Sequence, residues 1–217
     1  GKIIDSSTTD WSIMSFGAHS EYAEDIKKGS KSLLDFAKSD NGIDQEMNIC
    51  AAYARRIMAL RAAGITSSDS AIAPLVKHLV DNCGADGDQN LDGANDDIFI
   101  GFALLSTGTD PKGELIEGLK TNILKTQDTT SGAFYSFGSA SPDITGAGIN
   151  ILYYLKSLGC IIDDQTIVKA KNYLKTTQLA DGGWNAWDIS SDPITTFWSM
   201  EGINSLNEGQ SQWNSAG

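Results

Sequence analysis

The feature that most constrains the fold is the alternation of two kinds of helical segment along the chain. Segments of the first kind are apolar almost all round, and segments of the second kind are apolar on one stripe and rich in lysine elsewhere. A helix that is apolar all round has to be surrounded by protein, whereas an amphipathic helix lies at the surface. The alternation therefore predicts two concentric layers of helices. The expected inner helices are residues 10–20, 45–63, 97–107, 143–158 and 192–207, and the expected outer helices are residues 24–39, 71–83, 112–126 and 165–177.

The starts of the inner helices repeat at a period that fits a two-helix unit. Asp97, Asp143 and Asp192 each begin one of them, and these residues are 143 − 97 = 46 and 192 − 143 = 49 positions apart. Glycine also recurs inside these helices, where it costs about 1 kcal/mol relative to alanine, so we expect close approach of neighbouring backbones there. These glycines are Gly101, Gly146, Gly148 and Gly202.

The loops carry a second repeat. The order Gln178-x-x-x-Gly182-x-Trp184 follows the last amphipathic segment, and Gln127, Gly132 and Phe134 give the order glutamine, glycine, aromatic upstream. Connections after the outer helices are long and rich in glycine, aspartate and aromatic residues, whereas those after the inner helices are shorter. An up-and-down arrangement would collect all the long loops on one face, where we expect function to lie.

The alternating helices and the Q-x-x-x-G-x-W motif resemble the α/α-toroid superfamily of squalene cyclases, class II terpene cyclases and protein prenyltransferase β-subunits. The resemblance covers nearly the whole chain. It implies an all-α fold, a single domain over residues 1–217 that forms an α/α toroid of about five helical hairpins, the last of them incomplete. Full toroids of the superfamily have about six hairpins, so either the ring stays open or the given sequence stops before it closes. In that family the glutamine and tryptophan of the motif tie successive outer helices together, which implies structural roles for Gln178 and Trp184.

The chain departs from the enzymes of this superfamily at the residues that carry chemistry. Class II cyclases begin reaction with D-x-D-D, whose central aspartic acid protonates an alkene. The equivalent run here, Ala94-Asn95-Asp96-Asp97, lacks the first aspartate. Asp96 and Asp97 are therefore the candidate proton donors of an alternative, cyclase-like function.

The zinc site of the prenyltransferases is also incomplete. Those proteins hold zinc with an Asp-x-Cys pair and a later histidine. Asp81-Asn82-Cys83 matches the pair, but His19 and His78 both precede it. A catalytic zinc needs about three protein ligands, so we expect no zinc here. We also expect no other cofactor.

One loop has calcium-like spacing. Oxygen-bearing side chains alternate at Asp86, Asp88, Asn90 and Asp92, as in an EF-hand loop, but Leu91 stands where that loop needs glycine. We interpret the segment as a polar loop between repeats and keep calcium as the alternative.

Asp143, Asp192 and Trp187 are candidate ligand-binding residues on the long-loop face. An aspartate at a helix start is explained by capping alone, which contributes about 1 kcal/mol. The functional alternative is that these aspartates surround the mouth of the ring and bind a cation or polar ligand beside Trp187. A third hypothesis is carbohydrate processing by paired carboxylates about 5 to 9.5 Å apart.

The charge and the cysteines bear on partners and compartment. Sixteen basic against 28 acidic residues give a net charge of −12, which disfavours nucleic acid and anionic membranes as partners. No apolar run is long enough to span a bilayer. If the segments carrying Cys50 and Cys83 form a helical hairpin, both residues fall at the same end, and either a disulfide or two buried thiols fits that placement.

Related toroid domains without enzymatic activity occur in bacterial secreted and surface proteins, and the acidic chain resembles these most. The resemblance implies a non-catalytic binding or scaffold module of a secreted or surface-attached bacterial protein, monomeric, with any ligand on the long-loop face. Its partner is an unidentified small molecule, glycan or protein. We interpret Gly1 as a residue left by cloning and expect a secretion signal to have been removed before it. The cyclase-like and carbohydrate-processing enzymes are the alternatives.

Overall fold

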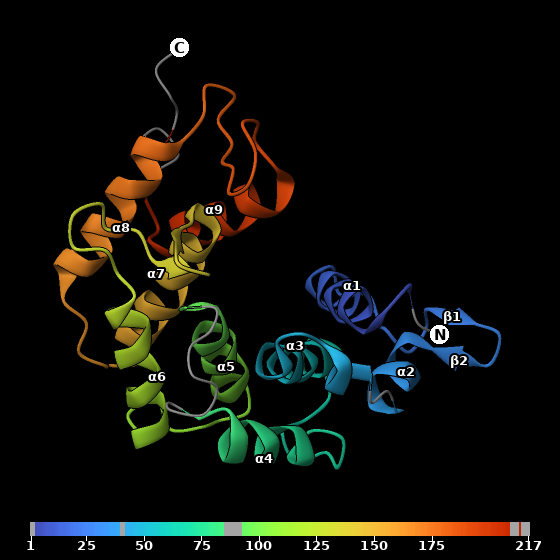
Figure 1. Cartoon of the computed structure of the whole chain (residues 1–217). Coiled ribbons are helices and arrows are strands. Elements are labelled where there is room, and N and C mark those ends of the chain that lie inside the picture. The colour runs from blue at the N-terminus through green and yellow to red at the C-terminus, as the bar shows by residue number, and fades with distance from the viewer. Residues whose placement is uncertain (1–2, 40–41, 85–92, 209–212, 214–217) are drawn as a thin grey trace. The chain divides into compact units, whose positions relative to one another are not determined.

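A computed structural model describes residues 3–39, 42–84, 93–208 and 213 of the chain (Figure 1). It confirms the all-α fold, because helices make up 59% of the structure and strands 5%. None of the described helices is both long and apolar enough to cross a membrane. The α-helices are α1 Ser6–Ala18, α2 Leu33–Ser39, α3 Ile49–Ala62, α4 Ala73–Asn82, α5 Asn95–Ser106, α6 Glu114–Lys125, α7 Pro142–Ser157, α8 Asp164–Thr177 and α9 Pro193–Ser205. The described residues also form a 3-10 helix, η1 Gly42–Gln45, and two short hairpins: β1 Lys27–Lys28 with β2 Lys31–Ser32, and β3 Tyr135–Ser136 with β4 Ser139–Ala140.

The sequence predicts one domain, and the internal contacts divide the chain into two compact units. Unit 1 contains residues 1–89 and 99–115, and unit 2 contains residues 90–98 and 116–217. Helix α5 passes from unit 2 into unit 1. Each unit is described by itself.

In unit 1, the expected inner helices α1 and α3 pack against each other, and α2 and α4 pack on them. Gly17 of α1 lies so close to α3 that a methyl group on it would meet the Ala62 carbonyl oxygen at 2.5 Å. Helix α3 buries side chains on most of its surface, whereas Leu79 is the one fully buried residue of α4. Burial in α3 and α4 therefore follows the two kinds of helix that the sequence distinguishes.

One expected helix of unit 1 is wrong over half its length. Residues 24–39 were expected to be one amphipathic helix, but the β1–β2 hairpin precedes α2, which begins only at Leu33. Gly29, with φ of 66°, makes the turn of this hairpin. The helix then starts at a reciprocal cap, in which the Asp35 N–H donates to Ser32 Oγ (3.0 Å) and the Ser32 N–H donates to Asp35 Oδ2 (2.9 Å).

The expected start of the first helix also needs correction. Helix α1 is capped by Asp5, which accepts from the Thr8 N–H, and Asp10 lies one turn further on with its side chain fully buried. Arg56 of α3 donates from Nε to Asp10 Oδ1 at 2.7 Å and from an Nη to the Ala37 carbonyl oxygen at 2.9 Å. Asp10 therefore neutralises a buried arginine and does not cap a helix.

A disulfide joins α3 to the end of α4. Cys50 and Cys83 are bonded, with their Cα atoms 5.7 Å apart, and the third cysteine, Cys160, is buried and forms no disulfide. Of the two alternatives for Cys50 and Cys83, the structure therefore has the disulfide.

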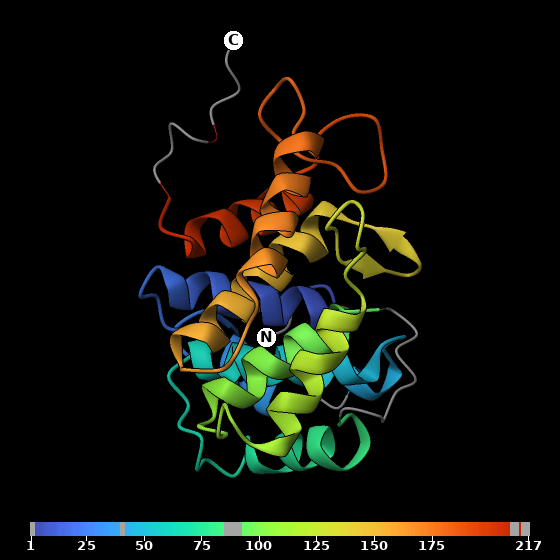
Figure 2. The same ribbon diagram turned by 90° about the vertical axis from the view of Figure 1, so that its left-hand side faces the viewer.

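In unit 2, α7 is the central helix, with α8 and α9 packed on it (Figure 2). The α7–α9 crossing is formed by glycine on both sides: a methyl group on Gly202 would lie 2.5 Å from the Gly146 carbonyl oxygen, and one on Gly146 would collide with the Trp198 carbonyl. A methyl group on Gly148 would lie 2.9 Å from the Phe134 ring. The expectation that glycine permits close backbone approach is confirmed at these positions.

Helix α9 differs from α7 in its exposure. Thr195, Ser199, Gly202 and Ile203 are its buried residues, whereas three large apolar side chains of the same helix, Ile194, Phe197 and Met200, are at least half exposed. Their spacing of three residues places them on one stripe. An apolar helix that the sequence predicts to be inner is therefore open along one side.

Candidate functional site

The Q-x-x-x-G-x-W segment after α8 forms a compact loop that we call the second clasp, with Gln178, Gly182 and Trp184 as its defining residues. Gln178 Nε2 donates to the Gly182 carbonyl oxygen at 2.8 Å, and Gly182 turns the chain with φ of 87°. The buried Trp184 ring donates from Nε1 to the Leu174 carbonyl oxygen at 2.8 Å. The Trp184 N–H donates to Thr196 Oγ1 at 3.0 Å, which joins the loop to α9.

The upstream copy, which we call the first clasp and define by Gln127, Gly132 and Phe134, repeats two of these hydrogen bonds and the turn at glycine. Gln127 Nε2 donates to the Gly132 carbonyl oxygen at 3.0 Å, and Gly132 has φ of 83°. The Phe134 ring is fully buried, and the backbone N–H of Phe134 donates to Thr145 Oγ1 at 3.0 Å, which joins this loop to α7. The repeat that the sequence suggests is therefore also a repeat of hydrogen bonds.

The two clasps differ in what covers them. In the first, Gln127 Nε2 makes a second hydrogen bond, at 2.9 Å, to the Thr166 carbonyl oxygen in the first turn of α8. A methyl group on Gly132 would lie 2.5 Å from the Lys169 backbone of the same helix. At Gly182, no described residue comes within 4 Å of the equivalent point. The first clasp is closed by a helix, and the second is open in the described part of the chain.

A groove of about 440 Å³ lies at the second clasp. Two carboxylates on it have pKa values below the usual range of aspartate. Hydrogen bonds from Ser191 Oγ and the Gly183 N–H lower the pKa of Asp181. For Asp192, burial raises the pKa, but hydrogen bonds led by that from the Thr195 N–H outweigh this effect and leave it lowered. Both groups are ionised at neutral pH, so the groove suits a cation or a basic group. The residues that line this groove include Asp181, Gly182, Ser191, Asp192, Pro193 and Thr196.

Asp192 and Asp143 have different roles at their helices. Asp192 is the N-cap of α9 and accepts from the Thr195 N–H at 2.8 Å. The N-cap of α7 is Ser141, so the expectation that Asp143 caps this helix is wrong. Both helices begin with proline, Pro142 and Pro193, because proline is suited to the first helical position. Asp143 therefore falls within the first turn, where it accepts a hydrogen bond from Ser141 Oγ.

Trp187 is 74% exposed, and Ile189, two positions further on, is 94% exposed. Both belong to the large loop that Figure 2 shows between α8 and α9. Among the three ligand-binding residues expected from the sequence, Asp192 lines the groove, whereas Asp143 and Trp187 are not in its lining. The long loop therefore offers the groove and a solvent-facing indole as separate features.

Asp96 and Asp97 are both buried, with 2% and 3% of their surfaces exposed. They lie in the first turn of α5, which begins at Asn95, earlier than expected. The Ala94 N–H just before the helix donates to the Tyr135 carbonyl oxygen at 3.1 Å. Carboxylates in a first turn interact favourably with the helix dipole, which gives both residues a structural role as well as a candidate catalytic one.

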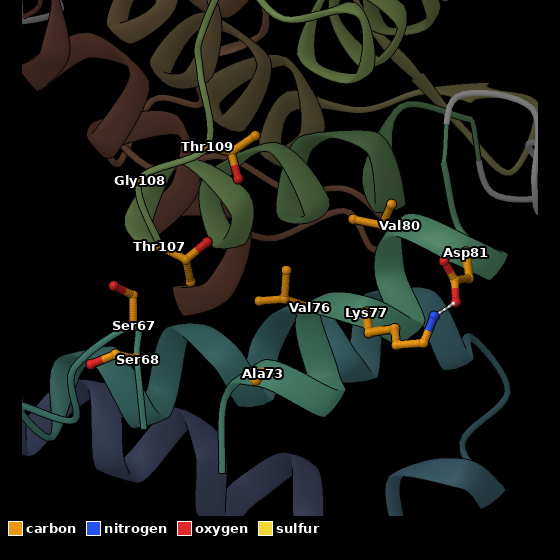
Figure 3. Close-up of a pocket in the computed structure, with 10 residues that line it drawn as sticks. All are labelled: Ser67, Ser68, Ala73, Val76, Lys77, Val80, Asp81, Thr107, Gly108 and Thr109. Atoms are coloured by element: carbon orange, nitrogen blue, oxygen red, sulfur yellow. Dashed lines mark hydrogen bonds and ion pairs between the residues drawn. The ribbon is translucent and has the colours of Figure 1, made fainter. Parts of the chain in front are cut away.

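Sequence reasoning missed a groove of about 600 Å³ in unit 1 (Figure 3). Val76 and Val80 of α4 provide apolar surface, and the Lys77–Asp81 ion pair lies on the same helix. Hydroxyl groups come from two segments that are far apart in the sequence, one with Ser67 and Ser68 and the other with Thr107 and Thr109. No local motif signals such a groove, because its parts are far apart in the sequence.

The described residues contain no group of three or more His, Cys, Asp or Glu side chains placed to hold a metal ion. The calcium candidates Asp86, Asp88, Asn90 and Asp92 lie outside the described residues. Cys83, the cysteine of the Asp-x-Cys pair, is bonded to Cys50 and is not a free thiolate for zinc.

Comparison with family models, with curated proteins and with solved structures found no significant match to this chain.

Proposed function

We propose that this chain is a non-catalytic binding or scaffold module of a secreted or surface-attached bacterial protein, built as an α/α toroid of about five helical hairpins. The repeated clasps and the alternating burial of α3 and α4 support the toroid arrangement. The Cys50–Cys83 disulfide supports a location outside the cytoplasm, because disulfides persist in oxidising compartments.

One observation carries the binding function, namely the open anionic groove of the second clasp on a long loop. Asp181 and Asp192 are held in the groove by hydrogen bonds to the loop and helix backbone, so the surface is preorganised. The exposed Trp187 supplies further contact area on the same loop.

The test combines turnover and binding. We expect no product when the intact protein is incubated with polyprenyl alkenes or oligosaccharides. We expect saturable binding, followed by tryptophan fluorescence, for ligands that contact the long loop, with weaker binding in Trp187→Ala. Leu158→Ala, a change of a partly exposed apolar residue elsewhere in unit 2, is the control. Product that depends on enzyme concentration would overturn the proposal.

The second candidate is a cyclase-like enzyme, favoured by one observation: Asp96 and Asp97 are adjacent, buried carboxyl groups at the start of an apolar helix. A general acid has to lie where it can pass its proton to the substrate, and the equivalent aspartates do so in the class II cyclases that the chain resembles. Under this alternative, Asp96→Asn or Asp97→Asn abolishes product formation while the far-ultraviolet circular dichroism spectrum is unchanged.

A further inference from the structure

We infer that the second clasp is a docking site for a basic amphipathic helix of a binding partner. The inference rests on the proposed function, a non-catalytic binding module, and names the kind of partner that its long-loop face takes.

The first clasp shows what this geometry binds. Its glutamine amide reaches the carbonyl oxygen of the third residue of α8, Thr166, and its glycine lies against the backbone of the sixth, Lys169. Only glycine admits so close an approach, because a side chain would collide with that backbone. The second clasp repeats the glutamine donor and the glycine at φ of 87°, and among the described residues it contacts no such helix.

The lining of the groove adds a preference for charge. Asp181 and Asp192 place two ionised carboxylates beside Gly182. The helix that covers the first clasp has the complementary character. It buries Ile167, Ala170 and Leu174 on one stripe, and its lysines are Lys169, Lys171 and Lys175. A partner helix with an apolar stripe and lysines on its other faces therefore matches both the backbone geometry and the charge of the second clasp.

Glu208 and Trp213, which follow α9 in the sequence, contact α8. Lys171 Nζ pairs with Glu208, and Lys175 Nζ lies 5.0 Å from the centre of the Trp213 ring. Neither of these two contacts involves a residue that lines the groove at the second clasp.

The probe is a synthetic peptide with the sequence of residues 163–178, DDQTIVKAKNYLKTTQ, which reproduces α8. It is titrated to about 1 mM into the intact, isotope-labelled protein, a range that detects weak binding. We expect saturable changes in the nuclear magnetic resonance signals of the Gln178 side-chain amide and the Gly182 N–H. Binding should weaken as salt is raised, because two carboxylates contribute to it.

Variants of both molecules separate the contributions. A peptide with serine in place of Ile167, Ala170 and Leu174 should not bind. Gln178→Ala in the protein should lower the affinity roughly three- to tenfold, the effect of one neutral hydrogen bond. Gln127→Ala is the matched control and should leave the affinity unchanged, because α8 already occupies its clasp. The comparison of the two peptides uses the unaltered protein, so it stays informative even if a protein variant fails to fold.

Several outcomes would overturn the inference. These are the absence of any change at Gln178 and Gly182, changes confined to the groove in unit 1, and equal affinity for the serine peptide. Self-association of the chain without peptide that changes the same signals would instead assign the surface to a second copy. Failure of peptide binding alone overturns only the helical partner, whereas turnover in the assay above overturns the binding module itself.

Discussion

At the scale of single residues, unit 1 contains a buried ion pair between Asp10 and Arg56. The Asp10 side chain is fully buried and that of Arg56 is 1% exposed, so both charges have left water. Removing Arg56 leaves the buried Asp10 carboxylate with only the longer contact to Arg55, whose Nε lies 3.7 Å from Oδ2, and an incompletely paired buried charge is costly.

We therefore expect Arg56→Met to destabilise the protein by about 3 to 5 kcal/mol, measured as the free energy of unfolding in urea. The control is Lys77→Met, which removes a cation from the exposed pair with Asp81 and should cost about 1 kcal/mol or less. Equal effects of the two changes would show that burial of the Asp10 pair adds nothing to stability.

The same pair predicts a pH dependence. Burial raises the pKa of Asp10 from 3.8 to about 6, although the charges of Arg56 and Arg55 oppose the increase. The folded state therefore holds this proton more tightly than the unfolded state. The contribution of Asp10 to the free energy of unfolding should fall as pH rises from about 4 to about 6 and be constant above that range. In Arg56→Met the fall should continue to higher pH. Urea unfolding at a series of pH values measures both curves, and parallel curves for the two proteins would contradict the assignment.

At the scale of helices, the crossing of α7 and α9 depends on glycine at the point of closest approach. Gly146→Ala should destabilise unit 2 by about 1 to 3 kcal/mol or more, because the added methyl group collides with backbone that has little room to move. Thermal unfolding measures the loss. Gly84→Ala is the control, since its methyl group would make ordinary contacts, the nearest at 3.4 Å. An unchanged Gly146→Ala variant would mean that the crossing is less tight than described.

Helical periodicity predicted the positions of the long helices well, with starts and ends within a few residues, because burial on one face imposes that period. It failed at residues 24–39, where lysines at helical spacing concealed a turn at Gly29 and a new cap at Ser32. The prediction that Asp10 caps the first helix was also wrong. In the sequence alone, an aspartate that pairs with an arginine 46 positions away cannot be distinguished from one that caps a helix. The clasps were visible because each lies within a short stretch of sequence, whereas the groove in unit 1 combines distant loops.

At the scale of the whole molecule, the two units carry different stabilising features. The disulfide belongs to unit 1, where it links residues 33 positions apart, and the clasps belong to unit 2. Closing a loop of this length stabilises a fold by about 2 to 4 kcal/mol, mainly by restricting the unfolded chain.

Replacing both Cys50 and Cys83 with serine should therefore lower the stability of unit 1 by about 2 to 4 kcal/mol. Amide hydrogen exchange should show faster opening of α3 and α4, with little change in α7 and α8. Cys160→Ser is the comparison, because it alters a cysteine of unit 2 that forms no disulfide. Equal loss of protection in both units would indicate that the two unfold as one cooperative body.

The reach of the first clasp also has a consequence for biosynthesis. Among the three hydrogen bonds that Gln127 Nε2 and the Phe134 N–H donate, the one from Gln127 to Thr166 joins the residues furthest apart in the sequence, 39 positions. The other two join residues 5 and 11 positions apart. Short-range contacts of this kind form early, since little chain entropy is lost in closing them. As the nascent chain emerges from the ribosome, the first clasp can close as soon as the opening turn of α8 is outside the exit tunnel, while α9 is still inside it.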